Sequence, residues 1–177
     1  MPLRKIIIYL ITLIFVISTV HAQTYQWAKR VGNNDAGDGQ ACITDSAGNM
    51  YVVGIFANTV DFDPGPGIAN LSSFFGTPDI YIAKYNSSGN YVWAFNIPAA
   101  GTNNEEVHAI KLDGQGNVYV AGAFGAGSFQ VDFDPGPGTA YIPTQNGYTD
   151  AFVAKYTSNG AYLWAISMGG SNTDFAY

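Results

Sequence analysis

Apolar residues in this chain come in short runs, and glycine, asparagine, aspartate and serine separate the runs. Within the runs, β-branched and aromatic side chains dominate, which is typical of β-strands. No segment after residue 22 keeps the 3.6-residue apolar period of an amphipathic helix. The pattern predicts strands at Gln40–Thr44, Met50–Phe56, Ile80–Tyr85, Tyr91–Asn96, His108–Leu112, Val118–Phe124, Ala151–Tyr156 and Tyr162–Ser167.

The last four of these strands repeat the first four, because the sequence Asp-Phe-Asp-Pro-Gly-Pro-Gly occurs twice, at Asp61–Gly67 and Asp132–Gly138. Aligning the chain on this motif aligns further positions. They are Trp27 with Trp93 and Trp164, Asp45–Asn49 with Asp113–Asn117, and Asp79–Tyr85 with Asp150–Tyr156. Spacings of 66 to 71 residues mark an internal repeat. Four-stranded units that repeat along a chain are the building blocks of a β-propeller.

The expected fold is therefore all-β, a partial β-propeller. We expect about two four-stranded blades, a closing strand at Tyr25–Val31 and the start of a third blade. The incomplete propeller would span 23–177, with repeat 1 at about 25–90, repeat 2 at about 91–161 and a partial repeat 3 at about 162–177. Asp45–Asn49 and Asn86–Asn90 place glycine where a short hairpin needs a positive φ, so the strands on either side of each should pair.

The repeat resembles that of bacterial secreted proteins with SBBP repeats, which are seven-bladed β-propeller repeats. The resemblance is carried by three segments. They are Asp45-x-x-Gly-Asn-x-Tyr-Val-x-Gly54 with its copy at Asp113–Gly122, Asp-x-x-x-Ala-Lys-Tyr at Asp79 and Asp150, and Met168-Gly-Gly-Ser-Asn-Thr-Asp174. It implies a propeller fold in an exported protein. The Asp-Phe-Asp-Pro-Gly-Pro-Gly insertion is similar to one in surface proteins of Gram-negative bacteria.

Residues 1–22 have the layout of a secretory signal peptide. Arg4 and Lys5 precede an apolar run over Ile6–Val20, and Ala22 ends a small-residue cleavage site. The run is shorter than the roughly 20 residues that a membrane-spanning helix needs, which favours cleavage over an uncleaved anchor. We therefore expect a secreted or cell-surface protein whose mature chain has no membrane span.

Export would leave 13 acidic and 5 basic side chains, a formal charge of −8. This charge argues against nucleic acid as a partner, because both would be negative. Cys42 is the only cysteine, so an intrachain disulfide is excluded. Because Cys42 aligns with Ile110, we expect it to be a small core residue.

The repeated motif contains the candidate metal ligands. Asp61 and Asp63, and likewise Asp132 and Asp134, alternate around a phenylalanine, so both carboxylates of a pair point the same way on an extended backbone. Two carboxylates with nearby carbonyl oxygens suit Ca²⁺. In the alternative, the aspartates cap their own turn and the phenylalanine packs inward. The connectivity places the motif on an acidic rim with Asn33–Asp35, Asp38 and Asn103–Glu106.

Other candidates for chemistry are few. The aligned tryptophans are expected to pack between blades rather than to form a sugar-binding platform. His108 is the only histidine after residue 22, so a catalytic triad or a histidine-rich zinc site lacks partners. His108 and Glu106 break the repeat symmetry, and Glu105 with Asp132 would be an acid pair for glycoside cleavage. We expect a non-catalytic scaffold or binding module. The alternative is a fragment of a propeller enzyme, quinoprotein-like or polysaccharide-active.

Two blades do not close a propeller, which has typically 4 to 8 blades. Each open blade face would expose about 350 Å² of largely apolar surface, near the upper end of what a monomer leaves exposed. We therefore expect either a piece of a longer chain that supplies the missing blades, or copies that associate to close the ring. A protein or glycan ligand is a further expected partner, and apart from Ca²⁺ no cofactor is expected.

Overall fold

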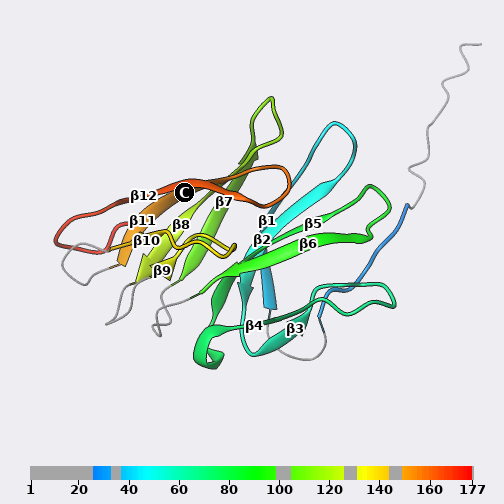
Figure 1. The fold of residues 1–177 in the computed structure, drawn as a ribbon, viewed down its shortest axis with the longest axis horizontal. Coiled ribbons are helices and arrows are strands. Elements are labelled where there is room, and N and C mark those ends of the chain that lie inside the picture. The colour runs from blue at the N-terminus through cyan, green and yellow to red at the C-terminus, as the bar shows by residue number, and fades with distance from the viewer. Residues whose placement is uncertain (1–25, 33–36, 99–104, 126–130, 144–148, 177) are drawn as a thin grey trace, which may run out of the picture.

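The structure is a computed structural model, and it describes residues 26–32, 37–98, 105–125, 131–143 and 149–176. In this part the chain forms β-strands and one short 3₁₀ turn, η1, at Phe74–Gly76. Two four-stranded antiparallel sheets stand side by side, and two small hairpins accompany them (Figure 1). The expected all-β fold is confirmed, and the sheets form an open, partial propeller rather than a closed ring.

The first blade contains β1 (Gly37–Thr44), β2 (Met50–Phe56), β5 (Asp79–Tyr85) and β6 (Tyr91–Ile97), in that order across the sheet. The second blade contains β7 (Glu106–Leu112), β8 (Val118–Gly125), β11 (Thr149–Tyr156) and β12 (Tyr162–Met168), also in chain order. These are the strands that the apolar pattern predicts, each within a few residues of the predicted ends. The two-blade prediction is confirmed.

Asp45 and Asp113 close the hairpin turns after β1 and β7. In each turn, the aspartate Oδ1 accepts hydrogen bonds from the backbone N–H groups two and four residues ahead, all at 2.9 Å. The side-chain amides of Asn49 and Asn117 donate to the other carboxylate oxygen at 2.8 and 2.9 Å. These amide bonds are the main reason why the pKa of each aspartate lies below its ordinary value. The Asp-x-x-Gly-Asn segment thus builds the turn from its own side chains.

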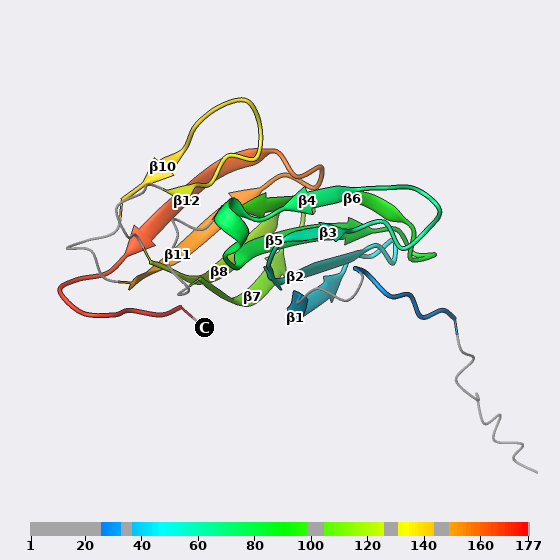
Figure 2. The ribbon, with the colours of Figure 1, turned by 90° about the horizontal axis from the view of Figure 1, so that it is seen from below.

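A small hairpin packs against each blade. Its strands are β3 (Thr59–Asp61) and β4 (Asn70–Ser72) in the first blade, and β9 (Val131–Asp132) and β10 (Tyr141–Ile142) in the second. Figure 2 shows β3 and β4 running alongside β5 and β6. Asn58, with a φ of 63°, turns the chain from β2 back along the blade, a conformation that asparagine tolerates better than most residues. The Asp-Phe-Asp-Pro-Gly-Pro-Gly motif is the loop of this hairpin.

The rim predicted for the motif is wrong. Pro64 of the loop lies near Gly89 in the β5–β6 turn, whereas Asp38 pairs with Ile55 at the other end of the blade. The reason is the hairpin, which carries the motif along the length of the blade instead of leaving it in a loose connection. Of the other members of the expected rim, Glu105 and Glu106 lie at the start of β7, and those at 33–35 and 103–104 lie outside the described residues.

A continuous apolar core fills the space between the blades. It takes Tyr51, Val53, Ile80, Ile82 and Ile97 from the first blade, and Val107, Ile110, Val118, Val120, Phe124, Phe152, Ala154 and Tyr156 from the second. Strand β7 packs against β1 and β2. A smaller cluster lies on the outer face of the first blade, where the β3–β4 hairpin covers Phe56, Tyr81 and Tyr85. The equivalent face of the second blade is covered by its hairpin and by the first blade together.

The expected closing strand is not formed. Tyr25 lies outside the described residues, and Gln26–Val31 is irregular. The segment still follows the first blade, because the Trp27 indole N–H donates to the Ser87 carbonyl at 3.0 Å. A strand needs a neighbouring strand for its backbone hydrogen bonds, and no described strand lies beyond this segment.

The blades are offset by one strand from the sequence repeats. Strand β12, which begins the predicted third repeat, is the fourth strand of the second blade. The residues after it, 169–176, form no strand, so the third blade is not begun in the described part. The predicted signal peptide, residues 1–22, lies outside the described residues. Within the part of the chain that the structure describes, no helix is long and apolar enough to cross a membrane.

Candidate functional site

Each Asp-Phe-Asp-Pro-Gly-Pro-Gly loop is closed by its first aspartate. The backbone N–H groups of Asp63 and Ala69 donate to Asp61 Oδ1 at 3.0 and 2.8 Å. Asp132 Oδ1 accepts the two equivalent bonds at the same distances. One carboxylate oxygen therefore ties the two ends of the loop together. The bond from Ala69, and then that from Asp63, lowers the pKa of Asp61.

The second aspartate folds over the glycines of the motif. The N–H of Gly65 donates to Asp63 Oδ1 at 2.7 Å, and the equivalent bond from Gly136 to Asp134 measures 2.8 Å. The other oxygen of Asp63 lies where a Cβ at Gly67 would stand, so a side chain at that position would push the carboxylate away. The glycines of the motif therefore leave room for the carboxylate to pack on the loop.

The phenylalanine between the aspartates anchors the loop in the blade. Phe62 and Phe133 are both fully buried. The Tyr85 hydroxyl donates to the Phe62 carbonyl at 3.1 Å, and the Tyr156 hydroxyl donates to the Phe133 carbonyl at 3.0 Å. Burial raises the pKa of both tyrosines, so they remain protonated donors. The sequence pattern predicts the inward phenylalanine but not the tyrosine, although Tyr85 and Tyr156 end the aligned Ala-Lys-Tyr segments.

The four candidate calcium ligands form two separate pairs, one in each blade. One oxygen of each carboxylate already accepts backbone N–H groups of its own loop. Among the described residues, no group of three or more histidine, cysteine, aspartate or glutamate side chains could hold a metal ion. Calcium at Asp61 and Asp63, or at Asp132 and Asp134, would be held by two carboxylates with carbonyl and water oxygens. Calcium binding stays a prediction.

A repeated tryptophan contacts the turn between the third and fourth strands of a blade. Trp93 of the first blade lies over Gly160 in the β11–β12 turn, and its indole N–H donates to the Ser158 carbonyl at 3.3 Å. Trp27 lies in the same way over Gly89 in the β5–β6 turn. Both glycines have a positive φ, 72° for Gly89 and 81° for Gly160, and a Cβ at Gly89 would crowd the Trp27 ring. The same contact is therefore made twice.

A lysine and a tyrosine complete the contact between the blades. Lys84 donates to the same Ser158 carbonyl at 3.1 Å, and its Nζ lies 4.8 Å from the centre of the Tyr51 ring. Tyr51 meets Trp93 edge to face, with ring centroids 6.1 Å apart. Two donors of the first blade thus converge on one carbonyl of the second, which fixes how the blades sit together.

The second blade carries the same three side chains, Lys155, Tyr119 and Trp164. Lys155 Nζ lies 4.7 Å from the centre of the Tyr119 ring, and Tyr119 meets Trp164 edge to face at 6.0 Å. No described turn covers this set. Trp164 is 38% exposed, and Lys155 pairs with Asp113 Oδ2 at 3.1 Å. The arrangement that holds the first blade to the second is thus built again on the far side of the second.

A groove of about 490 Å³ lies between the blades beside the Trp93 contact. It is lined by Trp93, Phe95, Asp134–Pro137 and Asn159–Tyr162, among others. Trp93 stacks on Phe95 with centroids 5.6 Å apart and 22° between the ring planes. Because Gly160 and Tyr51 contact the same indole, Trp93 serves packing between the blades. This is the packing role expected of the aligned tryptophans, shown here for Trp93; Trp164 is 38% exposed and packs against no described turn.

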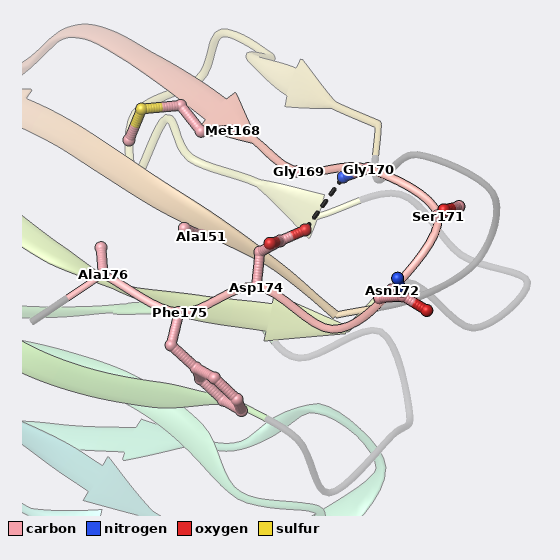
Figure 3. A pocket seen from close by; sticks show the side chains of 9 residues that line it. All are labelled: Ala151, Met168, Gly169, Gly170, Ser171, Asn172, Asp174, Phe175 and Ala176. Carbon is pink, nitrogen blue, oxygen red and sulfur yellow. Dashed lines mark hydrogen bonds between the residues drawn. The ribbon is translucent and has the colours of Figure 1, made fainter.

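A pocket of about 480 Å³ lies where the chain leaves β12 (Figure 3). Residues 169–176 curve around it, and the N–H of Gly170 donates to Asp174 Oδ2 at 2.9 Å. The N–H of Asp174 donates to the Thr149 carbonyl at 2.8 Å, which ties the segment to β11. Most of the wall is main chain and small side chains, so the pocket has few groups that could orient a ligand.

Cys42 is exposed, so its expected place in the core is wrong. The aligned Ile110 is buried, 4% exposed, in the core between the blades. The two residues hold the same place in their blades, since Cys42 pairs with Val52 and Ile110 with the aligned Val120. The difference is the neighbour: the first blade covers Ile110, and no described blade covers Cys42.

The residues that break the repeat symmetry lie at the start of β7. His108 Nε2 is 2.9 Å from Glu106 Oε2, and Glu105 is buried. Asp132, the acid suggested as a partner of Glu105, closes its own loop through Oδ1. His108 and Glu106 therefore lie together, whereas Asp132 has a structural role in its loop.

No protein-family model matches the chain. An uncharacterized WD repeat-containing protein, L264, of Acanthamoeba polyphaga mimivirus is 27% identical over 157 residues, which is 78% of this chain and 11% of that protein. The regulatory protein FlaEY of Caulobacter vibrioides is 28% identical over 134 residues, or 76% of this chain and 13% of that protein. The chain thus spans about a tenth of the length of these curated relatives. Similarity to a WD repeat-containing protein agrees with a propeller-like repeat module.

Proposed function

We propose that this chain is a non-catalytic β-propeller repeat segment that acts as a scaffold or binding module within a larger propeller. The observation that carries the proposal is the contact in which Trp93 and Lys84 of one blade converge on the Ser158 carbonyl of the next. The side chains that make this contact recur at the repeat period. The contact can therefore be repeated between each pair of neighbouring blades in a stack. The partner of each open blade face, in this proposal, is another blade.

The repeated aspartates have structural roles, which supports a non-catalytic function. Asp45 and Asp113 build hairpin turns, and Asp61 and Asp132 close the hairpin loops. The curated relatives carry the names of a WD repeat-containing protein and a regulatory protein, and neither name states an enzyme activity. The SBBP-like segments of the sequence fit the same proposal.

Activity assays on the mature chain, and on a variant that lacks Glu106 and His108, test whether the protein is an enzyme. We expect no release of reducing sugars from a polysaccharide panel and no bound quinone absorbance. Glu106→Gln combined with His108→Gln should leave folding and unfolding midpoint unchanged, as should the control Asp38→Asn at the aligned position of the first repeat. An activity that the double variant loses and the control keeps would show an enzyme instead.

Export is part of the proposal and rests on the layout of residues 1–22. The full chain, produced in a Gram-negative host, should be recovered outside the cytoplasm with Gln23 as its first residue. Fractionation followed by intact-mass measurement checks this. Recovery of the full-length chain in the cytoplasm would contradict export, and a full-length chain in the membrane fraction would show an uncleaved anchor.

A further inference from the structure

The far side of the second blade presents a second copy of this contact surface, and no described turn covers it. Lys155, Tyr119 and Trp164 repeat the geometry of the set that holds Ser158, with centroid distances that agree within 0.1 Å. Further along β12, Ile166 and Met168 are 49% and 45% exposed. The rings of Tyr119 and Trp164 are already in place, and Lys155 lies beside them on Asp113, so a ligand would meet a largely preorganised surface.

The chemistry of the ligand follows from what the first set binds. Trp93 and Lys84 bind a turn of the second blade. One main-chain carbonyl of that turn accepts hydrogen bonds from both side chains, and a glycine with positive φ lies under the indole ring. A lone sugar or anion offers no such combination. The matching group is a tight β-turn of the kind found at Asn86–Asn90 and Thr157–Ala161.

This chain carries such a turn on its own open side. The Asn86–Asn90 turn lies on the first blade and is contacted by Trp27, from a segment that forms no strand. On the same open face, Cys42 is exposed where the aligned Ile110 is covered by a blade. The open face of the first blade therefore corresponds, position by position, to the face of the second blade that the first blade already covers.

We infer that Trp164 and Lys155 of one copy bind the Asn86–Asn90 turn of a second copy, taking the place of that copy's Trp27. The inference rests on the proposed stacking of blades and identifies a second copy of this chain as the partner. The contact is head-to-tail, so it closes into a ring when the rotation per copy allows. With two blades per copy, propellers of typically 4 to 8 blades correspond to about two to four copies.

Light scattering after size exclusion, over a wide range of protein concentration, tests the inference on the mature chain. The thiol of Cys42 is titrated in the same samples, because docking of a second copy covers it. We expect a discrete assembly that grows with concentration, in which Cys42 reacts slowly, and a dilute monomer in which it reacts at once. An assembly whose Cys42 still reacts like that of the monomer would overturn the inferred contact.

Two variants should change the Kd of assembly in opposite directions. Trp164→Ala should raise the Kd of assembly at least about tenfold, as expected for a tryptophan at the centre of an interface. Trp27→Ala should lower the Kd, because it frees the turn that the second copy binds. Leu163→Ala is the matched control, because Leu163 is a 45% exposed apolar residue of the same strand outside the Trp164, Ile166, Met168 row. It should assemble like the unmodified chain.

The outcomes separate this inference from the proposed function. A cooperatively unfolding β-protein that stays monomeric at all concentrations overturns the self-association and leaves the stacking of blades to other parts of a longer protein. Assembly that survives Trp164→Ala also overturns the inference. A chain without cooperative unfolding or β-sheet circular dichroism would instead contradict the proposed function itself.

Discussion

The two blades have the same strand order and the same hydrogen-bonded turns, but they differ in what covers them. One face of the second blade packs on the first blade and belongs to the main core. Among the described residues, the equivalent face of the first blade is covered by the β3–β4 hairpin and contacted by the Trp27 segment. The repeat therefore specifies the blade, whereas the neighbour decides which of its residues are buried.

The pair Cys42 and Ile110 shows this difference at one position. Both residues pair with the aligned valine of the second strand, yet Cys42 is exposed and Ile110 is buried. The lysines differ in the same way. Lys84 donates to a carbonyl of the other blade, whereas Lys155 turns to Asp113 of its own blade. A comparison of matched substitutions in the two blades can therefore isolate the contribution of blade stacking.

The largest expected difference is at the Cys42 and Ile110 position. Ile110→Ala leaves a cavity in the core between the blades and should lower the free energy of unfolding by about 2–5 kcal/mol. Cys42→Ala, on an exposed surface, should change it by no more than about 0.5 kcal/mol. Urea denaturation of both variants checks this. Equal losses would show that the blades do not pack as described.

The aligned tryptophans provide the next test. Trp93→Ala removes the ring over Gly160 and one donor to Ser158, and it should cost roughly 2–3 kcal/mol, below the 3–5 of a fully buried tryptophan. Trp164→Ala in the dilute monomer should cost less than about 1 kcal/mol, because no described turn covers Trp164. Thermal unfolding at low protein concentration measures both. A larger loss of stability for Trp164→Ala than for Trp93→Ala would contradict the proposal that Trp93, and not Trp164, packs between the two blades.

The tyrosines that anchor the hairpin loops should behave alike in both blades. Tyr85→Phe and Tyr156→Phe each remove the hydroxyl that donates to a buried phenylalanine carbonyl. Each should cost about 1–3 kcal/mol, the usual cost of leaving a buried polar group unpaired. Denaturant midpoints provide the measurement, and Tyr141→Phe on the exposed β10 strand serves as the control. A loss at only one tyrosine would show that the two loops are not equivalent.

Acid should weaken the fold through its turn aspartates. The pKa values of Asp45, Asp61 and Asp113 are lowered in the folded state, so their stabilisation is present above about pH 4 and is lost as the pH falls through the folded pKa. Asp113→Asn should reduce this pH dependence more than Asp45→Asn, because Lys155 also hydrogen-bonds Asp113. Urea midpoints of both variants, measured between pH 2 and pH 7, test this prediction. An equal pH dependence of the midpoint in the two variants would contradict it.

The smallest expected effect is that of calcium. The loop carboxylates already accept backbone N–H groups, so a self-sufficient loop should show no change in Tm on addition of Ca²⁺. The calcium hypothesis predicts that millimolar Ca²⁺ raises Tm and that a chelator reverses the rise. Asp63→Asn and Asp134→Asn would then abolish that rise in their own loops. A rise in Tm that these variants leave intact would place the metal elsewhere.

Much of the fold can be predicted from the chain, because strand and turn signals are local. The bounds of β2 match the predicted Met50–Phe56, and the Asp-x-x-Gly-Asn turns form where glycine predicts them. The small hairpins escape prediction, because strands of two or three residues give no periodic signal. That omission also misplaces the motif on the wrong rim. The exposure of Cys42 cannot be read from a repeat alignment, since it depends on a neighbour rather than on the blade.

The two blades stack through the face that contains Ile110. The most direct test introduces Ile110→Cys into a Cys42→Ala chain and compares its thiol reactivity with that of Cys42 in the unmodified chain, at a concentration where both are monomeric. Cys42 should react at once, whereas the thiol at position 110 should react only as fast as the protein unfolds. Equal, rapid reaction of both thiols would contradict the stacking.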